Sequence, residues 1–366
     1  MNVPFVDLKI QYNSIKEEVQ EAINDVLDNT AFVLGKRVFD FESNFAKLHD
    51  ANFCLATNNG TSALHVALWA AGIKSGDEVI IPANTFFATA EAVALTGAKP
   101  VLVDNDEYYN IDVNQIEDKI TSKTKMILPV HLYGQPANVG KIKEIADKHN
   151  LLLAEDCAQA HCAEFNGQRV GTFGVAGCFS FYPGKNLGAF GEAGGVISKD
   201  VDFGRKMKLI RDHGAEEKYH HIVMGHNYRM SGIQGAVLGV KINYIEKWTE
   251  MRRANASLYN ELLAGIPQLE TPKEAEFAKH VYHLYVCQVE RREELMEFLS
   301  SKGIASGLHY PIPLHLLEAF KDYGYKKGEF PRVEAEASKI LSLPMYPELT
   351  KEHIKYVADA IKEFYK

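Results

Sequence analysis

The sequence lacks the features that mark membrane, secreted and nucleic-acid-binding proteins. Its apolar runs are short and are interrupted by glycine or polar residues, so no membrane span is expected. The amino-terminal residues have no basic segment followed by an apolar one, so no secretory signal is expected either. Basic residues number 40 against 48 acidic ones, which gives a net charge of −8. This acidic balance argues against non-specific binding to nucleic acid.

Cysteine is scarce, and its spacing suits neither a disulfide framework nor a metal site. The chain has five cysteines and no CxxC pair. An odd number without pairing spacing predicts reduced thiols, and therefore a cytoplasmic protein without a bound metal. The five residues are Cys54, Cys157, Cys162, Cys178 and Cys287.

The 366 residues contain 46% hydrophobic side chains, which is enough for two lobes with cores of their own. From residue 52 to 200, short apolar segments alternate with amphipathic ones, which predicts an α/β fold with a mostly parallel sheet between helices. The expected strands are 79–83, 99–104, 125–132, 151–156 and 177–182, and the expected helices are 61–72, 89–97 and 139–150. Residues 1–250 are predicted to form this large domain.

The pattern changes after residue 250, where residues 251–366 are predicted to form a smaller α+β domain. A long helix over 241–265 is expected to join the two lobes. Residues 280–290 alternate like an antiparallel strand, and 292–303 and 350–366 read as helices. The proline-rich stretch 307–315 cannot be a central strand.

Two polar residues follow predicted strands in a way that suits cofactor chemistry. Asp156 ends the apolar segment LLLAED, where a carboxylate could hold a protonated ring nitrogen, although Asp is also a common helix cap. Lys185 lies on the turn SFYPGKNLG, where nearby apolar groups would lower its pKa and favour an imine. A surface lysine in a loop is the other interpretation.

Further polar and aromatic residues point to an anionic, planar ligand. The segment NNGTSAL places free backbone N–H groups and the hydroxyls of Thr61 and Ser62 at a helix start, which suits a phosphate or a simple cap. Ser180 offers another hydroxyl. Phe86 lies at a strand end, where it would stack on a ring or join the core. Asn227 and Arg229 in GHNYRMSG are available to anions.

The order of these segments resembles the DegT/StrS-type nucleotide-sugar aminotransferases, a branch of the fold-type I pyridoxal-phosphate (PLP) enzymes. The resemblance covers essentially the whole chain. The segments that carry it are FVDLK (5–9), FVLGKRVFDFE (32–42), NNGTSAL, GDEVIIPANTFFAT (76–89), PVHLYGQPA (129–137), EDCAQAH (155–161), FSFYPGKNLGAFGEAGG (179–195), HNYRM (226–230), HYPIPLH (309–315) and LSLPMYP (341–347).

The resemblance implies a role for each candidate residue. Lys185 would bind PLP as a Schiff base and move a proton, while Asp156 would pair with the pyridine nitrogen. Gln159 would lie near the 3-oxygen of the ring, and Phe86 would stack on it. The phosphate would be held by Thr61, Ser62, Ser180 and, from the neighbouring subunit of a homodimer, Asn227. The sugar substrate would lie near His309, Tyr310, His315 and Arg229.

The resemblance also implies a reaction. An amino group would pass from glutamate, leaving 2-oxoglutarate, to the cofactor as pyridoxamine phosphate (PMP), and then to a keto sugar nucleotide. The segments HLYGQPA, SFYPGKNLGA and HYPIPLH look closest to enzymes acting at C-3 of a dTDP-3-oxo-6-deoxyhexose, for an amino sugar of a surface polysaccharide or secondary metabolite. A few relatives carry His in place of the lysine and are dehydratases, whereas this sequence keeps Lys185.

Several alternatives stay open at this point. The acceptor could be a 4-keto sugar nucleotide, an oxidised UDP-N-acetyl sugar or a keto-cyclitol. Other fold-type I reactions, such as aldol cleavage or desulfuration, and a non-catalytic regulator of the same fold are the remaining ones. The chain departs from many relatives at Ser231, where Asp is common, and at Cys162, where Gly is commoner. These departures bear on the substrate rather than on the cofactor.

Overall fold

The centre of the molecule is a seven-stranded sheet in the order β1-β9-β8-β5-β4-β2-β3. The structure is a computed structural model that describes residues 1–366. All pairings are parallel except those of β9, which runs antiparallel to both β1 and β8, so the predicted mostly parallel sheet is confirmed. The strands are β1 (Phe53–Thr57), β2 (Glu78–Pro82), β3 (Lys99–Val103), β4 (Thr124–Ile127), β5 (Leu152–Asp156), β8 (Ala176–Ser180) and β9 (Gly194–Ser198).

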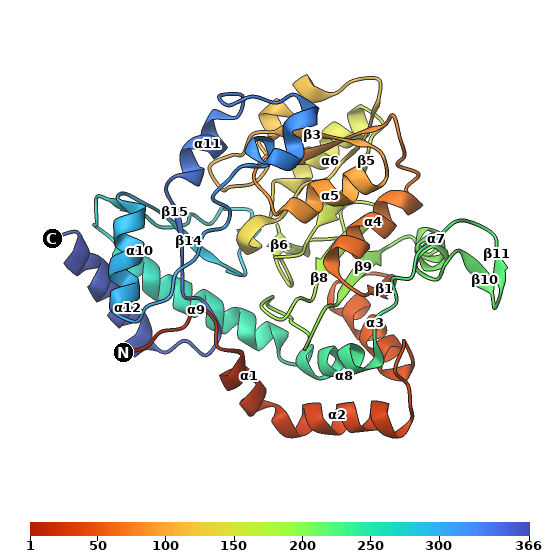
Figure 1. Ribbon diagram of the computed structural model, residues 1–366, viewed down its shortest axis with the longest axis horizontal. Coiled ribbons are helices and arrows are strands. Elements are labelled where there is room, and N and C mark those ends of the chain that lie inside the picture. Colours follow the sequence, from red (N-terminus) through yellow and green to blue (C-terminus); the bar gives the residue numbers. More distant parts are fainter.

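Helices cover both faces of this sheet (Figure 1). In β2, Val79 and Ile81 belong to one core cluster and Ile80 to another, because successive side chains of a strand point to opposite faces. Val79 and Ile81 share their cluster with residues of α4 and α5, and Ile80 shares its own with α6. The flanking helices are α4 (Gly60–Ala70), α5 (Phe87–Leu95), α6 (Val139–Lys148) and α7 (Val201–Arg211).

Three amino-terminal helices and α8 complete the large lobe. The helices are α1 (Leu8–Ser14), α2 (Lys16–Asp28), α3 (Lys36–Leu48) and α8 (Gly232–Lys241). A Cβ atom on Gly235 of α8 would lie 2.5 Å from the Val38 side chain of α3, so the two helices pack closely only because this residue is glycine. Figure 1 shows α2 and α8 along one edge of the molecule.

A second core belongs to a smaller lobe around a three-stranded antiparallel sheet, β12-β14-β15. Val3 of the amino terminus joins this core, and both chain ends lie beside it in Figure 1. The elements are β12 (Leu269–Glu270), β14 (Tyr285–Val289), β15 (Ile340–Leu343), α9 (Ile245–Leu263), α10 (Arg292–Ser301) and α12 (Lys351–Phe364). The boundary expected at residue 250 falls inside α9, and the domain limits stay a prediction.

The segment between α10 and β15 returns to the large lobe. Four of its side chains, Leu314, Phe320, Phe330 and Val333, belong to the core cluster around α4 and α5. This segment contains α11 (Pro331–Ala337). The proline-rich stretch 307–315 begins at the small lobe, where Gly307 pairs with Ser342 of β15, and reaches the core of the large lobe at Leu314.

Three predicted elements are much shorter than the sequence pattern suggested, one of them the strand expected over 125–132, which ends at Ile127. The helix expected over 241–265 begins only at Ile245, after a turn that separates it from α8. The strand expected over 280–290 is limited to β14, because Val281 and Leu284 donate their N–H groups to Gly134 and Tyr133 of a large-lobe loop. Residues 280–284 therefore link the two lobes.

A hairpin formed by β10 (Ala215–Glu217) and β11 (His220–His221) projects from the body of the molecule (Figure 1). Two large apolar side chains are exposed here: Tyr219, in the turn between the strands, is 84% accessible, and Met224, just after β11, is 80% accessible. A separate small sheet joins β6 (Glu164–Phe165), β7 (Gln168–Arg169) and β13 (Ala278–Lys279).

None of the helices combines the length and the apolar character that a membrane crossing needs. All five cysteines are free, as their spacing predicted, and all five are buried.

Candidate active site

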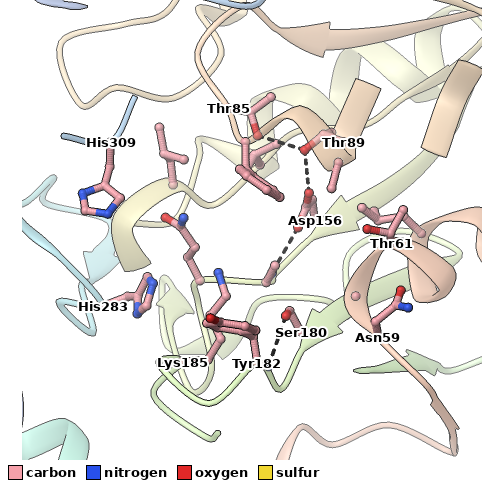
Figure 2. Close-up of a pocket in the computed structure, with 18 of the residues that line it drawn as sticks. Asn59, Thr61, Thr85, Thr89, Asp156, Ser180, Tyr182, Lys185, His283 and His309 are labelled. Carbon is pink, nitrogen blue, oxygen red and sulfur yellow. Dashed lines mark hydrogen bonds between the residues drawn. The ribbon is translucent and has the colours of Figure 1, made fainter. Parts of the chain in front are cut away.

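A cavity of about 660 Å³ lies where the carboxyl ends of β2 and β5 meet the start of α4. It is the place that open α/β sheets commonly use for ligands. Residues from distant parts of the chain converge on it, as Figure 2 shows. Its lining includes Asn59, Gly60, Thr61, Thr85, Phe86, Thr89, Asp156, Gln159, Ser180, Tyr182, Lys185, Glu192, His283, His309 and Tyr310.

Asp156 is a buried carboxylate that is held by neutral groups only. Its Oδ2 accepts a hydrogen bond from the Thr89 hydroxyl at 2.8 Å, and its Oδ1 accepts one from the Ala158 N–H at 3.1 Å. Thr85 in turn donates to Thr89 at 2.8 Å. Burial raises the pKa of Asp156, and no cation forms an ion pair with it. A cationic ligand group at this position would restore the charged form.

Lys185 extends into the same cavity from a tight loop. The loop is closed by hydrogen bonds from the Lys185 N–H to Tyr182 O and from the Ala189 N–H to Phe181 O, both 2.8 Å. A Cβ on Gly188 would lie 2.2 Å from Pro183 O, so only glycine allows the loop to fold back this closely. Burial lowers the pKa of Lys185 to about 8, while Asp156 opposes this shift. The uncharged fraction of this lysine near neutral pH is therefore much larger than that of an exposed lysine, which favours imine formation.

The start of α4 forms a cup with the end of β8. Thr61 and Ser180 line the cavity, and a Cβ on Gly60 would lie only 2.7 Å from Ser180 Cβ. Asn59 caps the helix by accepting the Ser62 N–H at 2.8 Å. The first N–H groups of α4 and the two hydroxyls face one space at the positive end of the helix dipole, which suits a phosphate.

Gln159 connects the cavity to the segment after α10. Its Oε1 accepts the Tyr133 N–H at 2.6 Å, and its Nε2 donates to the Tyr310 hydroxyl at 3.0 Å. The Tyr133 hydroxyl donates to His309 O. Phe86 caps α5 at the mouth of the cavity, 57% exposed, with its ring 5.6 Å from that of Tyr310. His309 contacts Ser342 through Nδ1 at 2.8 Å.

Four predicted site residues do not line this cavity. Ser62 is buried one residue further along α4 than Thr61. His315 is also buried, and its Nε2 contacts Glu334 at 2.8 Å, on the core side of the segment. Asn227 is exposed and Arg229 half-buried in the strand-like stretch before α8, where their backbones pair with Asp212 and Thr57. Their proposed contacts with ligand stay predictions.

The lining residues for which the sequence predicted no role include Thr89, Glu192 and His283. Thr89 lies one helical turn after Phe86, a spacing that could have revealed it. Glu192 belongs to the glycine-rich run GAFGEAGG, whose pattern predicts a loop and gives no sign of a functional carboxylate. His283 lies in an alternating segment that reads as a strand, so its role in the cavity has no signal in the sequence.

Glu155, the neighbour of Asp156, points away from the cavity and has a structural role. Its carboxylate accepts the N–H groups of Gly171, Phe173 and Gly174 at 2.7 to 3.1 Å, and His131 Nε2 at 3.1 Å. The side chains of His131 and Glu155 are fully buried. Two adjacent carboxylates at one strand end thus face opposite sides of the sheet, and only Asp156 is available to a ligand.

The two departures from the family pattern have structural explanations. Cys162 has a φ of 65°, in the left-handed region where glycine is favoured, so a Gly at this position is unstrained and Cys is not. Ser231 caps α8 by accepting the Gln234 N–H, a function that Asp serves equally well. Neither residue lines the cavity.

Comparison with known proteins assigns the chain to a family. The profile of the DegT/DnrJ/EryC1/StrS aminotransferase family matches residues 13–362. The chain belongs to this family. It is therefore a sugar-nucleotide aminotransferase in class, and the resemblance inferred from its motifs is confirmed.

Several relatives match this aminotransferase over nearly its whole length. A pleiotropic regulatory protein of Geobacillus stearothermophilus is 45% identical over 100% of this chain and 99% of its own. The dTDP-3-amino-3,4,6-trideoxy-alpha-D-glucose transaminase of Streptomyces venezuelae is 39% identical over 99% and 96%. A UDP-N-acetyl-3-dehydro-alpha-D-glucosamine 3-aminotransferase of Acidithiobacillus ferrooxidans is 41% identical over 98% and 97%. The crystal structure of S. venezuelae DesV with a ketimine intermediate superposes with a TM-score of 0.98, at 40% identity over 100% and 99%.

The cofactor of this aminotransferase is PLP, with PMP as its aminated form. The residues of the cavity fit it. The cup between α4 and β8 offers hydroxyl and N–H donors to a phosphate, and Asp156 is a buried carboxylate that lacks a cation. Lys185 shares the cavity and has a pKa suited to imine formation. The chemistry that PLP supplies when bound is an electron sink for the pair released at the substrate carbon.

Proposed function

We propose that this enzyme transfers an amino group from glutamate to C-3 of a dTDP-3-oxo-6-deoxyhexose, to make an amino sugar for a surface polysaccharide or a secondary metabolite. The observation that supports it most is the convergence of Lys185, Asp156 and the phosphate cup on one cavity. Together they offer the base, the anionic partner for a ring nitrogen and the anion site that a transaminase needs.

Lys185, Asp156 and Gln159 have separate roles in this proposal. Lys185 binds the cofactor at rest and, once released, carries the proton that must leave the donor carbon. Its pKa of about 8 makes about 10% of the free amine neutral at pH 7, compared with about 0.03% for a lysine of pKa 10.5. Asp156 keeps the ring nitrogen protonated, and its bonds to Thr89 and Ala158 fix its orientation. Gln159 has a second amide N–H available to the 3-oxygen.

The identity of the nucleotide in the substrate is supported less strongly than the position of amination, C-3. The S. venezuelae relative is named for a dTDP sugar and the A. ferrooxidans relative for a UDP-N-acetyl sugar, at 39% and 41% identity. Both names specify C-3. An oxidised UDP-N-acetyl sugar aminated at C-3 is therefore the second candidate, ahead of a 4-keto sugar nucleotide or a keto-cyclitol.

A panel of keto sugar nucleotides tests the proposed reaction. Incubated with glutamate, the purified enzyme should first release 2-oxoglutarate and convert its cofactor to PMP. It should then aminate a dTDP-3-oxo-6-deoxyhexose, with the new C–N bond located by NMR. Amination of UDP-linked substrates only would favour the second candidate. Release of no 2-oxoglutarate would contradict transamination and favour aldol cleavage, desulfuration or a regulatory role.

A regulatory function has some support in the name of the G. stearothermophilus relative. The cavity argues for catalysis instead, because a non-catalytic protein has no need for a lysine and a carboxylate held in this geometry. A cytoplasmic location, which the cysteine pattern predicted, stays a prediction.

The exposed apolar residues support a homodimer with shared sites. Phe32 and Val33 lie between α2 and α3, Phe39 lies within α3, and these three side chains are 51 to 59% exposed. Tyr219 and Met224, in and just after the hairpin, are exposed as well. Such residues favour burial against another chain. Asn227 follows the hairpin and is exposed, at a position from which it could reach the phosphate cup of a partner but does not line its own.

Mixed dimers test this sharing of sites. Lys185→Ala and Asn227→Asp should each leave little activity at limiting PLP, the second because it brings a negative charge towards the phosphate. A dimer with one variant chain of each kind would contain one intact site out of two. Random pairing makes about half of the dimers mixed, so co-expression should restore about a quarter of wild-type activity. A mixture of Lys185→Ala with the double variant is the control and should restore none. Absence of recovery in the first mixture would contradict shared sites.

A further inference from the structure

His283 lies in the link between the two lobes, and its backbone is fixed on both sides. The neighbouring Val281 N–H donates to Gly134 O at 3.0 Å. The buried Arg252 donates from Nη1 to Tyr282 O at 3.1 Å and to His283 O at 3.3 Å. The imidazole lines the cavity, and Figure 2 shows it beside the end of the Lys185 side chain. The fold thus places this ring firmly next to the reactive amine.

The hydrogen bonds of Asn186 determine which nitrogen of His283 carries the proton. Asn186 Nδ2 donates to Val281 O at 3.1 Å, so its Oδ1 is the atom that faces His283 Nδ1, at 3.2 Å. An amide oxygen only accepts, and Nδ1 must therefore be the donor. The lone pair of the neutral ring is then on Nε2, the ring nitrogen that makes no hydrogen bond in the structure.

The surroundings keep His283 neutral. Burial lowers its pKa well below the usual value, and the nearby groups Lys185, Arg252, His309 and His161 act in the same direction. A neutral acceptor can orient an amine without the negative charge that would raise the pKa of that amine. Asp156, by contrast, does raise the pKa of Lys185. The site therefore has one charged and one uncharged acceptor around Lys185.

We propose that His283 is a positioning residue for Lys185: its free Nε2 becomes a hydrogen-bond acceptor for the lysine amino group when this amine is released from the cofactor, and so directs the amine while it carries a proton. The proposal rests on the proposed function of Lys185. Asn186, which is adjacent in sequence to Lys185, fixes the tautomer, so the lysine loop itself prepares the acceptor. A misdirected amine is costly, because a displacement of about 1 Å reduces rates by about 100-fold.

Substitutions of His283 separate this role from a purely structural one. In single turnover with glutamate, His283→Phe should slow cofactor amination by about 10- to 100-fold. His283→Gln, which keeps an acceptor, should recover most of that loss. His283→Asp should raise the pKa of Lys185, measured in the cofactor-free full-length chain from the pH dependence of its trinitrophenylation, by about one unit or more. Equal rates for the Phe variant and wild type, or an unmoved pKa in the Asp variant, would overturn the proposal.

The tautomer gives a readout that does not depend on catalysis. In protein labelled with ¹⁵N-histidine, the His283 signal, identified by its loss in His283→Gln, should show Nδ1 protonated and Nε2 unprotonated from pH 6 to 9. Asn186→Ala should shift this equilibrium. An Nε2-protonated ring in wild type would overturn the proposal even if transamination is normal. A wild-type enzyme that releases no 2-oxoglutarate would instead reject the proposed function, whatever the tautomer.

Discussion

Lys185→Ala should abolish transamination, with a loss of at least about 10⁴-fold in turnover. One amine is asked to bind the cofactor, to leave, and then to move a proton, so its removal affects every stage. The purified variant should also lose the visible absorbance of the Schiff base between lysine and cofactor. Both effects can be measured on the same sample, by spectroscopy and by release of 2-oxoglutarate from glutamate.

Lys199→Ala provides the matched control. Lys199 is exposed, follows β9 and does not line the cavity, so its loss should leave spectrum and turnover unchanged. The melting temperature of Lys185→Ala should stay close to that of wild type without cofactor, because the loop is closed by backbone bonds. Wild-type turnover in Lys185→Ala would contradict the assignment of Lys185 as the residue that binds the cofactor and moves the proton.

Asp156→Asn should reduce turnover by about 10³-fold while the protein stays folded. The amide has the shape of the carboxylate but no charge, so it cannot keep the ring nitrogen protonated. The amide oxygen can keep the contact with the Ala158 N–H, and the amide NH2 can donate to the Thr89 hydroxyl once that hydroxyl donates to Thr85 instead. The expected defect therefore lies in the rate of proton removal rather than in folding, and a single-turnover reaction with glutamate measures it.

The adjacent carboxylate offers a matched control for this experiment. Glu155→Gln should lower the melting temperature, because three backbone N–H groups and His131 would lose a charged acceptor. Its cofactor spectrum should nevertheless remain normal in the folded fraction. A full-rate Asp156→Asn enzyme would contradict the role assigned to Asp156.

The pKa values give the direction in which pH acts on these groups. The pKa of Lys185 is lowered to about 8, so its neutral, reactive form increases as pH rises through this value. Burial raises the pKa of Asp156, so without a cationic partner it takes up a proton at a higher pH than an exposed Asp. A bound pyridinium reverses that shift, and the holoenzyme should therefore keep Asp156 charged to lower pH.

Much of the fold was predictable because its signals are local. Alternation of apolar strands and amphipathic helices indicated the mostly parallel sheet, and each expected strand of the sheet lies within a few residues of its predicted place. The strand predicted over 280–290 was too long, because residues 280–284 alternate in polarity without pairing in a sheet. There Val281 and Leu284 bind a loop of the large lobe instead of a neighbouring strand, and no local pattern reports such a partner.

The sequence by itself determined the candidates for the chemistry, because each has a short-range motif: Lys185 on its glycine-closed turn, Asp156 at a strand end and the cup at Thr61. Only the tertiary structure decided which of them share a cavity. It placed His315 against Glu334 and away from the lining, and it brought His283 from the link between the lobes to the side of Lys185. The physical reason is that burial, hydrogen-bond partners and tautomers depend on residues far apart in the chain, which come together only on folding.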